Sequence, residues 1–229
     1  MTERGAEAGA HAGLFLTFEG IDGCGKTTQL HRLVERLRSE GWDVLMTVEP
    51  GGTAVGTQIR RILLDPANGN LSPTTELLLY FAARAQNVDE LIRPALASGR
   101  IVVSDRFTDS TLAYQGVARG LGEEIVETLH RIACREVRPD LTICIDIDLE
   151  TSIERARTRN RERENDGAAT ESRLDDEAAE FHGRVREAYL ALAQREPERF
   201  RLVDGRGTID EVAGRVWRVA EPAVRKRLT

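Results

Sequence analysis

A run of apolar residues that leads directly into a glycine-rich turn constrains this chain more than any other feature. Residues 15–18 are predicted to form a strand, and a helical pattern begins after the turn. Between them, Gly20, Gly25, Lys26 and Thr27 fit the pattern GxxxxGK[ST]. In this pattern, glycines let several backbone N–H groups converge on phosphate oxygens, and the helix N-terminus adds its dipole. The sequence therefore predicts a phosphate-binding P-loop.

The use of lysine supports this interpretation. Lysine and arginine together number 32, but only Lys26 and Lys226 are lysines. A lysine is a compact point charge on a flexible stem, whereas an arginine is a planar fork. We therefore expect Lys26 to reach the outer phosphates and Thr27 to hold a Mg²⁺ that bridges them. The residues expected to contact the bound nucleotide are Gly20, Ile21, Asp22, Gly23, Cys24, Gly25, Lys26, Thr27 and Thr28.

Composition limits the class of protein. A chain of 229 residues is long enough for one α/β domain with a full core, and it contains no apolar run near the roughly 20 residues of a membrane span. Its net charge of −6 argues against a nucleic-acid coat protein or a basic membrane-surface binder. The three cysteines are odd in number and lack metal-ligand spacing. We expect a cytoplasmic protein with small-molecule partners, and neither a nucleic-acid nor a membrane partner.

Predicted strands and helices alternate along the chain without a hairpin signal. After the first strand, further strands are predicted at residues 44–48, 101–104, 141–147 and 200–203. This alternation is typical of a parallel sheet with helices on both faces. The predicted fold is a three-layer P-loop α/β fold with a five-stranded parallel sheet. It forms a single domain over residues 14–229, preceded by a flexible tail over residues 1–13.

One segment of low complexity, residues 159–173, is rich in arginine and contains almost nothing to bury. We expect it to be exposed and mobile. Such an arginine run is usually a solvated face, and the alternative is a lid, over about residues 157–174, that brings arginine to phosphates on closure. At helical spacing the arginines divide between two sides, so they cannot all reach one ligand.

Two further strands end in turns that carry functional residue types. The sequence Glu49-Pro50-Gly51-Gly52-Thr53 follows one strand, and Asp105-Arg106 follows another. Ligand sites collect at the carboxyl ends of strands in open parallel sheets. On the helix that begins at Pro73, Tyr80 and Arg84 lie four residues apart and project from one side. Without other information, a core aromatic beside a solvated arginine explains that pair equally well.

Two functional classes fit a compact P-loop domain: a kinase acting on small molecules, and a nucleotide-driven switch or motor. A GTPase needs an Asn-Lys-x-Asp guanine reader, which the two lysines of this chain cannot supply. Motors usually carry partner-binding domains, for which we expect no room here. A kinase is favoured, because Asp105-Arg106 and the arginine-rich segment could neutralise the charge of two nucleotides held end to end.

The chain resembles the thymidylate kinase family from Leu14 onward, through five motifs in combination. They are Phe18-Glu19-Gly20-Ile21-Asp22-Gly23-x-Gly25-Lys26-Thr27-Thr28, Glu49-Pro50-Gly51-Gly52-Thr53, Tyr80-x-x-x-Arg84, Asp105-Arg106-Phe107 and Ala113-Tyr114-Gln115-Gly116. The resemblance implies a homodimer that transfers the γ-phosphoryl of ATP to dTMP with Mg²⁺, giving dTDP and ADP. The alternative is a P-loop deoxynucleoside kinase, or a nucleoside-monophosphate kinase of another base preference.

The resemblance also implies how the acceptor base is bound. Tyr80 takes the place of the family's phenylalanine and would stack on thymine. Arg84 would donate to a thymine carbonyl. Thr111 and Gln115 would lie at the edge of the base.

Roles around the sugar and the phosphates follow from the same resemblance. Asp22 would take the sugar 3′-OH, and Tyr114 would fill the space that a ribose 2′-OH needs. Arg60 and Arg106 would hold the acceptor's 5′-phosphate. The groups that would bind Mg²⁺ or organise its waters are Thr27, Asp105 and Glu49.

The chain departs from the family pattern in two places. Val48 stands where many members have an arginine, and the lid is longer than usual. Gly23 stands where a P-loop arginine could be, so the resemblance implies that the lid supplies the catalytic arginine, with Arg157 and Arg173 as candidates. Arg206, in the loop after the last strand, is an expected ATP contact. The expected catalytic residues are Lys26, Asp105, Arg106, Arg157 and Arg173.

Overall fold

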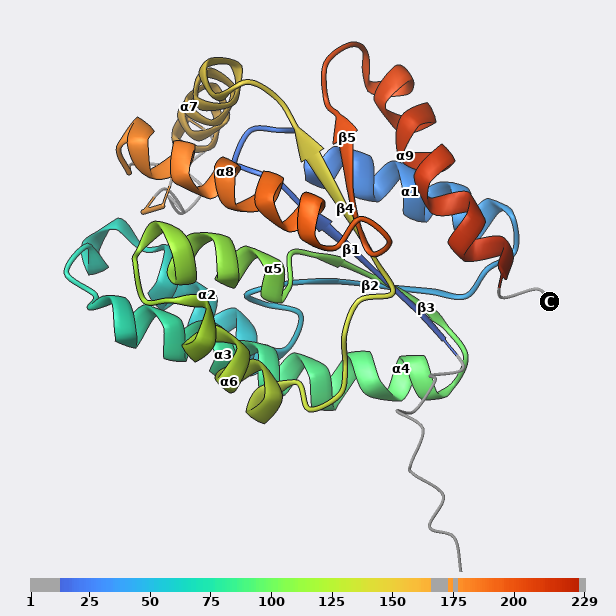
Figure 1. The fold of residues 1–229 in the computed structure, drawn as a ribbon, viewed down its shortest axis with the longest axis horizontal. Helices are drawn as coiled ribbons and strands as arrows, with labels where there is room; N and C mark the ends of the chain where they lie inside the picture. Colours follow the sequence, from blue (N-terminus) through green and yellow to red (C-terminus); the bar gives the residue numbers. More distant parts are fainter. Residues whose placement is uncertain (1–12, 166–172, 175–176, 227–229) are drawn as a thin grey trace, which may run out of the picture.

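Five parallel strands form the sheet at the centre of the molecule, as predicted. The computed structural model describes residues 13–165, 173–174 and 177–226 (Figure 1). The strands are β1 (Leu14–Glu19), β2 (Val44–Val48), β3 (Ile101–Asp105), β4 (Leu141–Asp146) and β5 (Phe200–Asp204). Neighbouring strands pair in parallel in the order β2-β3-β1-β4-β5. The carboxyl ends of β1, β2 and β3 therefore meet at one edge of the sheet.

Helices cover both faces of this sheet (Figure 1). They are α1 (Lys26–Ser39), α2 (Ala54–Leu64), α3 (Pro73–Asn87), α4 (Arg93–Ala97), α5 (Thr108–Thr111), α6 (Glu123–Ala133), α7 (Leu149–Asn165), α8 (Ala179–Arg195) and α9 (Ile209–Arg225). Alternate residues of β1 point to opposite faces. Leu16 and Phe18 join the core formed with α1, α8 and α9, whereas Phe15 packs with Ile92 and Leu96 on the other face. The result is the predicted three-layer arrangement.

The polar stretch at residues 108–122 is more regular than its composition indicates. It begins as α5 and continues as a π-helical segment, Leu112–Ala118. Partners elsewhere in the fold satisfy several of its polar groups. Thr108 Oγ1 lies 2.8 Å from His130 Nδ1, and Arg199 donates to Asp109 at 2.7 Å. These contacts allow a polar sequence to be buried as a helix, which brings the side chains of α5 to the edge of the sheet.

The low-complexity segment, predicted over residues 159–173 to be exposed and mobile, is helical in its first part. Helix α7 extends to Asn165 and so includes residues 159–165. Residues 166–172 and 175–176, which belong to the predicted lid or border it, lie outside the described residues, as do residues 1–12 of the predicted tail. Within the described part of the chain, no helix is both long and apolar enough to span a bilayer.

Candidate active site

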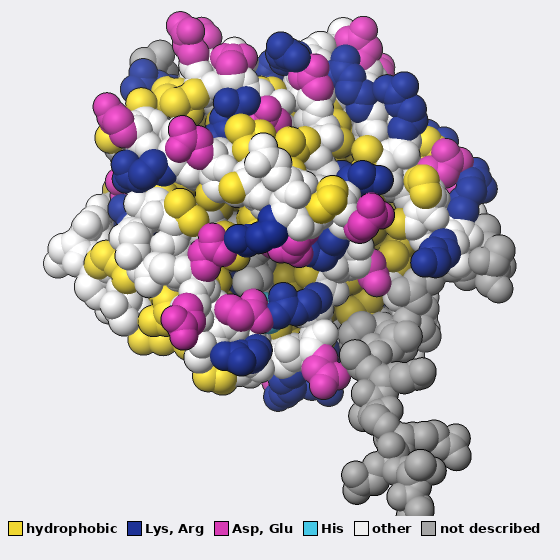
Figure 2. Space-filling model, viewed as in Figure 1, with side chains coloured by type: hydrophobic (Ala, Val, Ile, Leu, Met, Phe, Trp, Pro, Cys, Tyr) yellow, Lys and Arg dark blue, Asp and Glu magenta, His cyan; other side chains and the backbone are white. Residues whose placement is uncertain are grey.

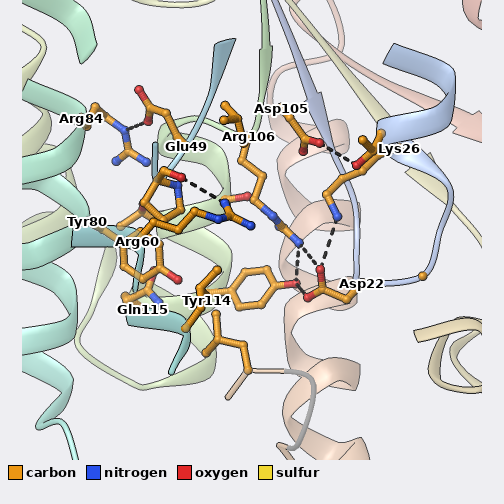
Figure 3. Close-up of a pocket in the computed structure, with 18 of the residues that line it drawn as sticks. Asp22, Lys26, Glu49, Arg60, Tyr80, Arg84, Asp105, Arg106, Tyr114 and Gln115 are labelled. Carbon is orange, nitrogen blue, oxygen red and sulfur yellow. Dashed lines mark hydrogen bonds and ion pairs between the residues drawn. The ribbon is translucent and has the colours of Figure 1, made fainter. Parts of the chain in front are cut away.

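A cavity of about 370 Å³ lies at the carboxyl ends of β1, β2 and β3. Residues of the P-loop line one part of it, and residues of α3 and of the stretch after β3 line another. Figure 3 shows these side chains converging from elements that are far apart in the sequence. Two ligands held end to end would therefore share one continuous space.

The P-loop glycines adopt conformations that other residues rarely take. Gly20 has φ +136°, and Gly25, which precedes the first residue of α1, has φ +91°. A Cβ at Gly20 would lie 2.5 Å from the carbonyl oxygen of Ile145. Only glycine fits there without a shift of the backbone. The loop thus turns β1 into α1 and places Lys26 at the helix N-terminus, as the motif predicted.

Gly23 lies directly against α7. A Cβ at this position would lie 2.2 Å from the carbonyl oxygen of Ser152, and the Ser152 hydroxyl donates to the carbonyl oxygen of Asp22. A larger side chain at Gly23 would push α7 away from the loop. An arginine at this P-loop position is therefore incompatible with the packing of this chain.

Asp22 lies at the centre of a charged cluster in the cavity (Figure 3). Arg106 Nη2 donates to Asp22 Oδ1 at 2.7 Å, and Lys26 Nζ lies 3.3 Å from the same oxygen. The Tyr114 hydroxyl donates to Asp22 Oδ2 at 2.9 Å. The structure therefore brings together four residues that the sequence assigned to two different ligands.

The backbone of Arg106 is held in the left-handed region, with φ +71°. Its N–H donates to the carbonyl oxygen of Phe18 at 2.9 Å, and its own carbonyl accepts from Ser104 Oγ at 2.7 Å. This conformation is unfavourable for a residue with a Cβ and persists because the surroundings fix it. Burial opposes the charge, but Tyr114 and Asp22 raise the pKa of Arg106 above its usual value, so it stays cationic.

Two oxygen ligands for a divalent cation lie side by side. Thr27 Oγ1 donates to Asp105 Oδ2 at 2.7 Å, beside the P-loop (Figure 3). Hydroxyl and carboxylate oxygens are the donor types that Mg²⁺ prefers, and this cation commonly completes its shell with water and substrate phosphates. The residues at this position fit the predicted Mg²⁺.

Glu49 lines the cavity, and two neighbouring side chains engage its carboxylate. The side chain is 3% exposed, and both carboxylate oxygens are occupied: Arg84 Nε lies 2.5 Å from Oε2, and Asn87 Nδ2 donates to Oε1 at 2.9 Å. Burial raises the pKa of Glu49, and Arg84 counteracts this effect. In this structure Glu49 holds Arg84, and its role near the metal stays a prediction.

The residues predicted around the base all line the cavity. Tyr80 forms part of the wall, and Gln115 Nε2 donates to Glu76 at 2.8 Å. Arg84 Nη1 and Thr111 Oγ1 are buried and find no hydrogen-bond partner among the described residues. Unpaired buried polar atoms are rare in folded proteins and usually indicate a missing ligand or water. Here one cationic donor and one hydroxyl are available to a polar molecule.

Arg60 also lines the cavity, where its Nη1 donates to the carbonyl oxygen of Pro50 at 3.0 Å. Val48, which replaces the family's arginine, lines the cavity as well. Among the described residues, the cationic side chains that line the cavity are therefore Lys26, Arg60, Arg84, Arg106 and one further arginine.

That further arginine is Arg155 on α7, which lines the cavity but was not singled out from the sequence. Arg155 lies three residues after Ser152, and residues three apart share one face of a helix. Because Ser152 contacts the P-loop, Arg155 faces the loop as well. The sequence could not indicate this, because it does not show which face of α7 meets the loop.

The two predicted lid arginines lie elsewhere. Arg157 is exposed and borders a separate groove with Leu149 and Ile153. Arg173 is 8% exposed; its Nε donates to the carbonyl oxygen of Leu63, and its Nη2 forms an ion pair with Glu76 at 2.7 Å. Both placements disagree with a phosphate-binding role in this conformation.

Arg206 is exposed and paired. Its Nε donates to Asp204 Oδ1 at 2.8 Å, and it is not among the residues that line the cavity. The contact of Arg206 with ATP therefore stays a prediction.

This protein belongs to the class of P-loop enzymes with room for two ligands. The parallel sheet and the P-loop define the class, and the cavity extends from the P-loop to α3 and the stretch after β3. The sequence model of thymidylate kinase matches residues 18–216. The chain belongs to the thymidylate kinase family.

Individual relatives agree with this assignment. The chain is 55% identical to thymidylate kinase of Pelobacter propionicus, and the match covers 88% of this chain and 90% of the relative. It is 50% identical to thymidylate kinase of Syntrophotalea carbinolica, and that match covers 89% of this chain and 93% of the relative. Among solved structures, it is similar to thymidylate kinase from Ehrlichia chaffeensis, with a TM-score of 0.72 and 32% identity over 91% of this chain and 98% of the other.

Proposed function

We propose that this protein transfers the γ-phosphoryl group of ATP to dTMP, giving dTDP and ADP. One observation carries the proposal beyond family membership: the P-loop and a pocket with two unpaired polar groups, Arg84 Nη1 and Thr111 Oγ1, share one cavity. A phosphate donor and a base-bearing acceptor can thus be held in contact, which is the main requirement of phosphoryl transfer.

On the donor side, the P-loop amides and Lys26 bind the phosphates of ATP. Thr27 and Asp105 would hold Mg²⁺, which would neutralise phosphate charge when bound. Asp105 is the last residue of β3 and is fixed by the sheet, so the distance between Thr27 and Asp105 is preorganised. Lys26 is only 7% exposed, so water screens its charge weakly.

On the acceptor side, Tyr80 stacks on the base, and Arg84 donates to a ring carbonyl through Nη1. If this carbonyl is the one at C4 of thymine, cytosine presents an amino group in its place, so a fixed guanidinium disfavours cytosine. Asp22 accepts the 3′-OH, and Tyr114 occupies the space next to C2′. The 5′-phosphate lies between Arg60 and Arg106, facing the donor.

A coupled ADP-release assay tests this assignment with dTMP, thymidine, dUMP, UMP and CMP. We expect dTMP to give the highest kcat/KM and thymidine to give no turnover, because the arginines recognise a phosphate. Arg84→Met keeps the volume but removes the donor, and we expect kcat/KM for dTMP to fall about tenfold or more.

A faster reaction with thymidine would indicate a deoxynucleoside kinase, and a preference for CMP would indicate a monophosphate kinase of another base preference. Either result would contradict the proposal.

The proposed assembly is a homodimer formed through α2, α3 and α6. These helices pack side by side on one face of the sheet, and they expose Val55, Leu78 and Ile132 at 48%, 51% and 70%. Apolar side chains lie among charged ones on the face of the molecule that Figure 2 shows. Exposed apolar side chains on adjoining helices favour a protein interface. A cytoplasmic location is proposed with it, because all three cysteines are free, as in a reducing compartment.

Ile132→Glu is expected to convert the dimer to a monomer, because it places a charge in a buried apolar contact. Light scattering after size-exclusion chromatography measures the mass. Ile209→Glu is the matched control, since Ile209 is 52% exposed on α9, away from these helices. A dimeric Ile132→Glu variant, or a monomeric parent, would refute this interface.

A further inference from the structure

The carboxylate of Glu19 is a charged group of the site that the proposed reaction leaves without a role. Glu19 is the last residue of β1 and directly precedes the P-loop, its side chain is 0% exposed, and it does not line the cavity. A buried carboxylate is costly unless it is hydrogen-bonded, so its partners indicate what it does.

Glu19 accepts three hydrogen bonds. The backbone N–H of Phe107 donates to Oε1 at 2.8 Å. The hydroxyl of Tyr189 donates to Oε2 at 2.9 Å, and the hydroxyl of Ser110 donates to the same oxygen. The partners come from two segments that are far apart in the chain: Phe107 and Ser110 lie at α5, and Tyr189 lies on α8.

The same two hydroxyls accept from Arg106. Its Nη1 lies 2.9 Å from Ser110 Oγ and 3.3 Å from Tyr189 OH. A hydroxyl has one hydrogen to donate and lone pairs to accept with. Ser110 Oγ and Tyr189 OH also lie 3.0 Å apart, but a carboxylate is the stronger acceptor. When both hydrogens point to Glu19, both oxygens turn their lone pairs to Arg106.

We propose that Glu19 is a positioning residue: it orients the hydroxyls of Ser110 and Tyr189 so that they hold the Arg106 guanidinium in place for the acceptor's phosphate. This inference rests on the proposed function. The acid never touches the substrate and acts through two neutral groups. Arg106 Nη2 remains directed at Asp22, on the cavity side.

The charges around Glu19 make this arrangement sensitive to pH. Burial and the neighbouring Asp109 raise the pKa of Glu19 to about 7, while Arg106, Ser110 and the Phe107 amide counteract this. Tyr189 on α8 and Cys144 on β4 are the other titratable neighbours, and the pKa of each is raised, so both stay neutral. Protonated Glu19 must donate a hydrogen bond, which turns one hydroxyl hydrogen toward Arg106.

Glu19→Gln tests the proposal in the full-length enzyme. The amide keeps the shape of the carboxylate, but its NH2 group donates hydrogen bonds, whereas the carboxylate only accepts them. At pH 8 we expect kcat/KM for dTMP to fall about tenfold, with KM for ATP within about twofold of the parent. At pH 5.5 the parent itself carries a protonated Glu19, so the ratio of parent to variant should fall toward one. Ionisation of the substrate phosphates affects both enzymes alike and cancels in this ratio.

Tyr189→Phe is the companion variant, since it removes one hydroxyl and keeps the buried ring. We expect a loss of about threefold at pH 8, and no further loss when it is combined with Glu19→Gln, because both act through the same guanidinium. If Glu19→Gln does not fold, as judged by thermal unfolding, Tyr189→Phe and its pH profile carry the test alone.

A ratio of parent to variant that stays constant with pH, or an equal loss toward ATP and dTMP, would overturn the proposal and leave Glu19 a structural role. Failure of the proposed function is a separate result, since it would appear in the parent enzyme as absent turnover of dTMP.

Discussion

Lys26→Arg will lower kcat by on the order of a hundredfold, about 3 kcal/mol of transition-state stabilisation, although the positive charge is kept. Lys26 is 7% exposed and lies 3.3 Å from Asp22, whose carboxylate already contacts Arg106. A planar guanidinium cannot fit this space and follow the transferring phosphoryl group as a slim ammonium does. Steady-state kinetics with dTMP and ATP measure the effect.

Lys226→Arg is the matched control, because Lys226 is the other lysine of the chain and lies exposed just after α9. It should leave kcat unchanged. Near-normal turnover of Lys26→Arg would contradict the proposed role of the P-loop lysine.

Arg155→Ala is expected to lower kcat by roughly a thousandfold, while the affinity for dTMP measured without ATP stays close to that of the parent. Arg155 lines the cavity from α7, so it can meet charge that spreads over the transferring group. Isothermal titration gives the affinity, and single-turnover kinetics give the rate of the chemical step.

Arg157→Ala and Arg173→Ala test the two lid arginines that the sequence predicted to be catalytic. Arg157→Ala should turn over like the parent, because its side chain is exposed beside another groove. Arg173→Ala should instead lower the free energy of unfolding by roughly 1–3 kcal/mol, because it removes one partner of buried Glu76, which keeps Gln115 and Arg119. A loss of kcat confined to Arg157→Ala or Arg173→Ala would show that the lid acts in a different conformation.

Local patterns were enough to predict the sheet and the P-loop. The strand period, the glycines at 20 and 25 and the lysine that follows depend on short-range geometry, which the sequence expresses directly. The segment 108–118 could not be predicted as a buried helix, because its polar groups are satisfied by His130 and Arg199, which lie far along the chain.

The sequence could not place some residues of the site for the same reason. Glu49 has the chemistry of a metal ligand, and only the fold shows that Arg84 and Asn87 occupy both of its oxygens. The choice among lid arginines depended on which face of α7 meets the P-loop. Sequence spacing groups the arginines by face but cannot say which group faces the site.

The contact between Gly23 and Ser152 joins the phosphate-binding loop to the helix that bears Arg155. Because the Ser152 carbonyl occupies the space where a Cβ would stand, the loop and α7 touch backbone to backbone, and the Ser152 hydroxyl bonds the loop at Asp22. Backbone contacts of this kind are stiff, unlike contacts between long side chains. We therefore expect that any displacement of the loop on phosphate binding shifts the first turns of α7, and with them Arg155, which lies one turn further along. Binding of the donor would then also change the position of Arg155.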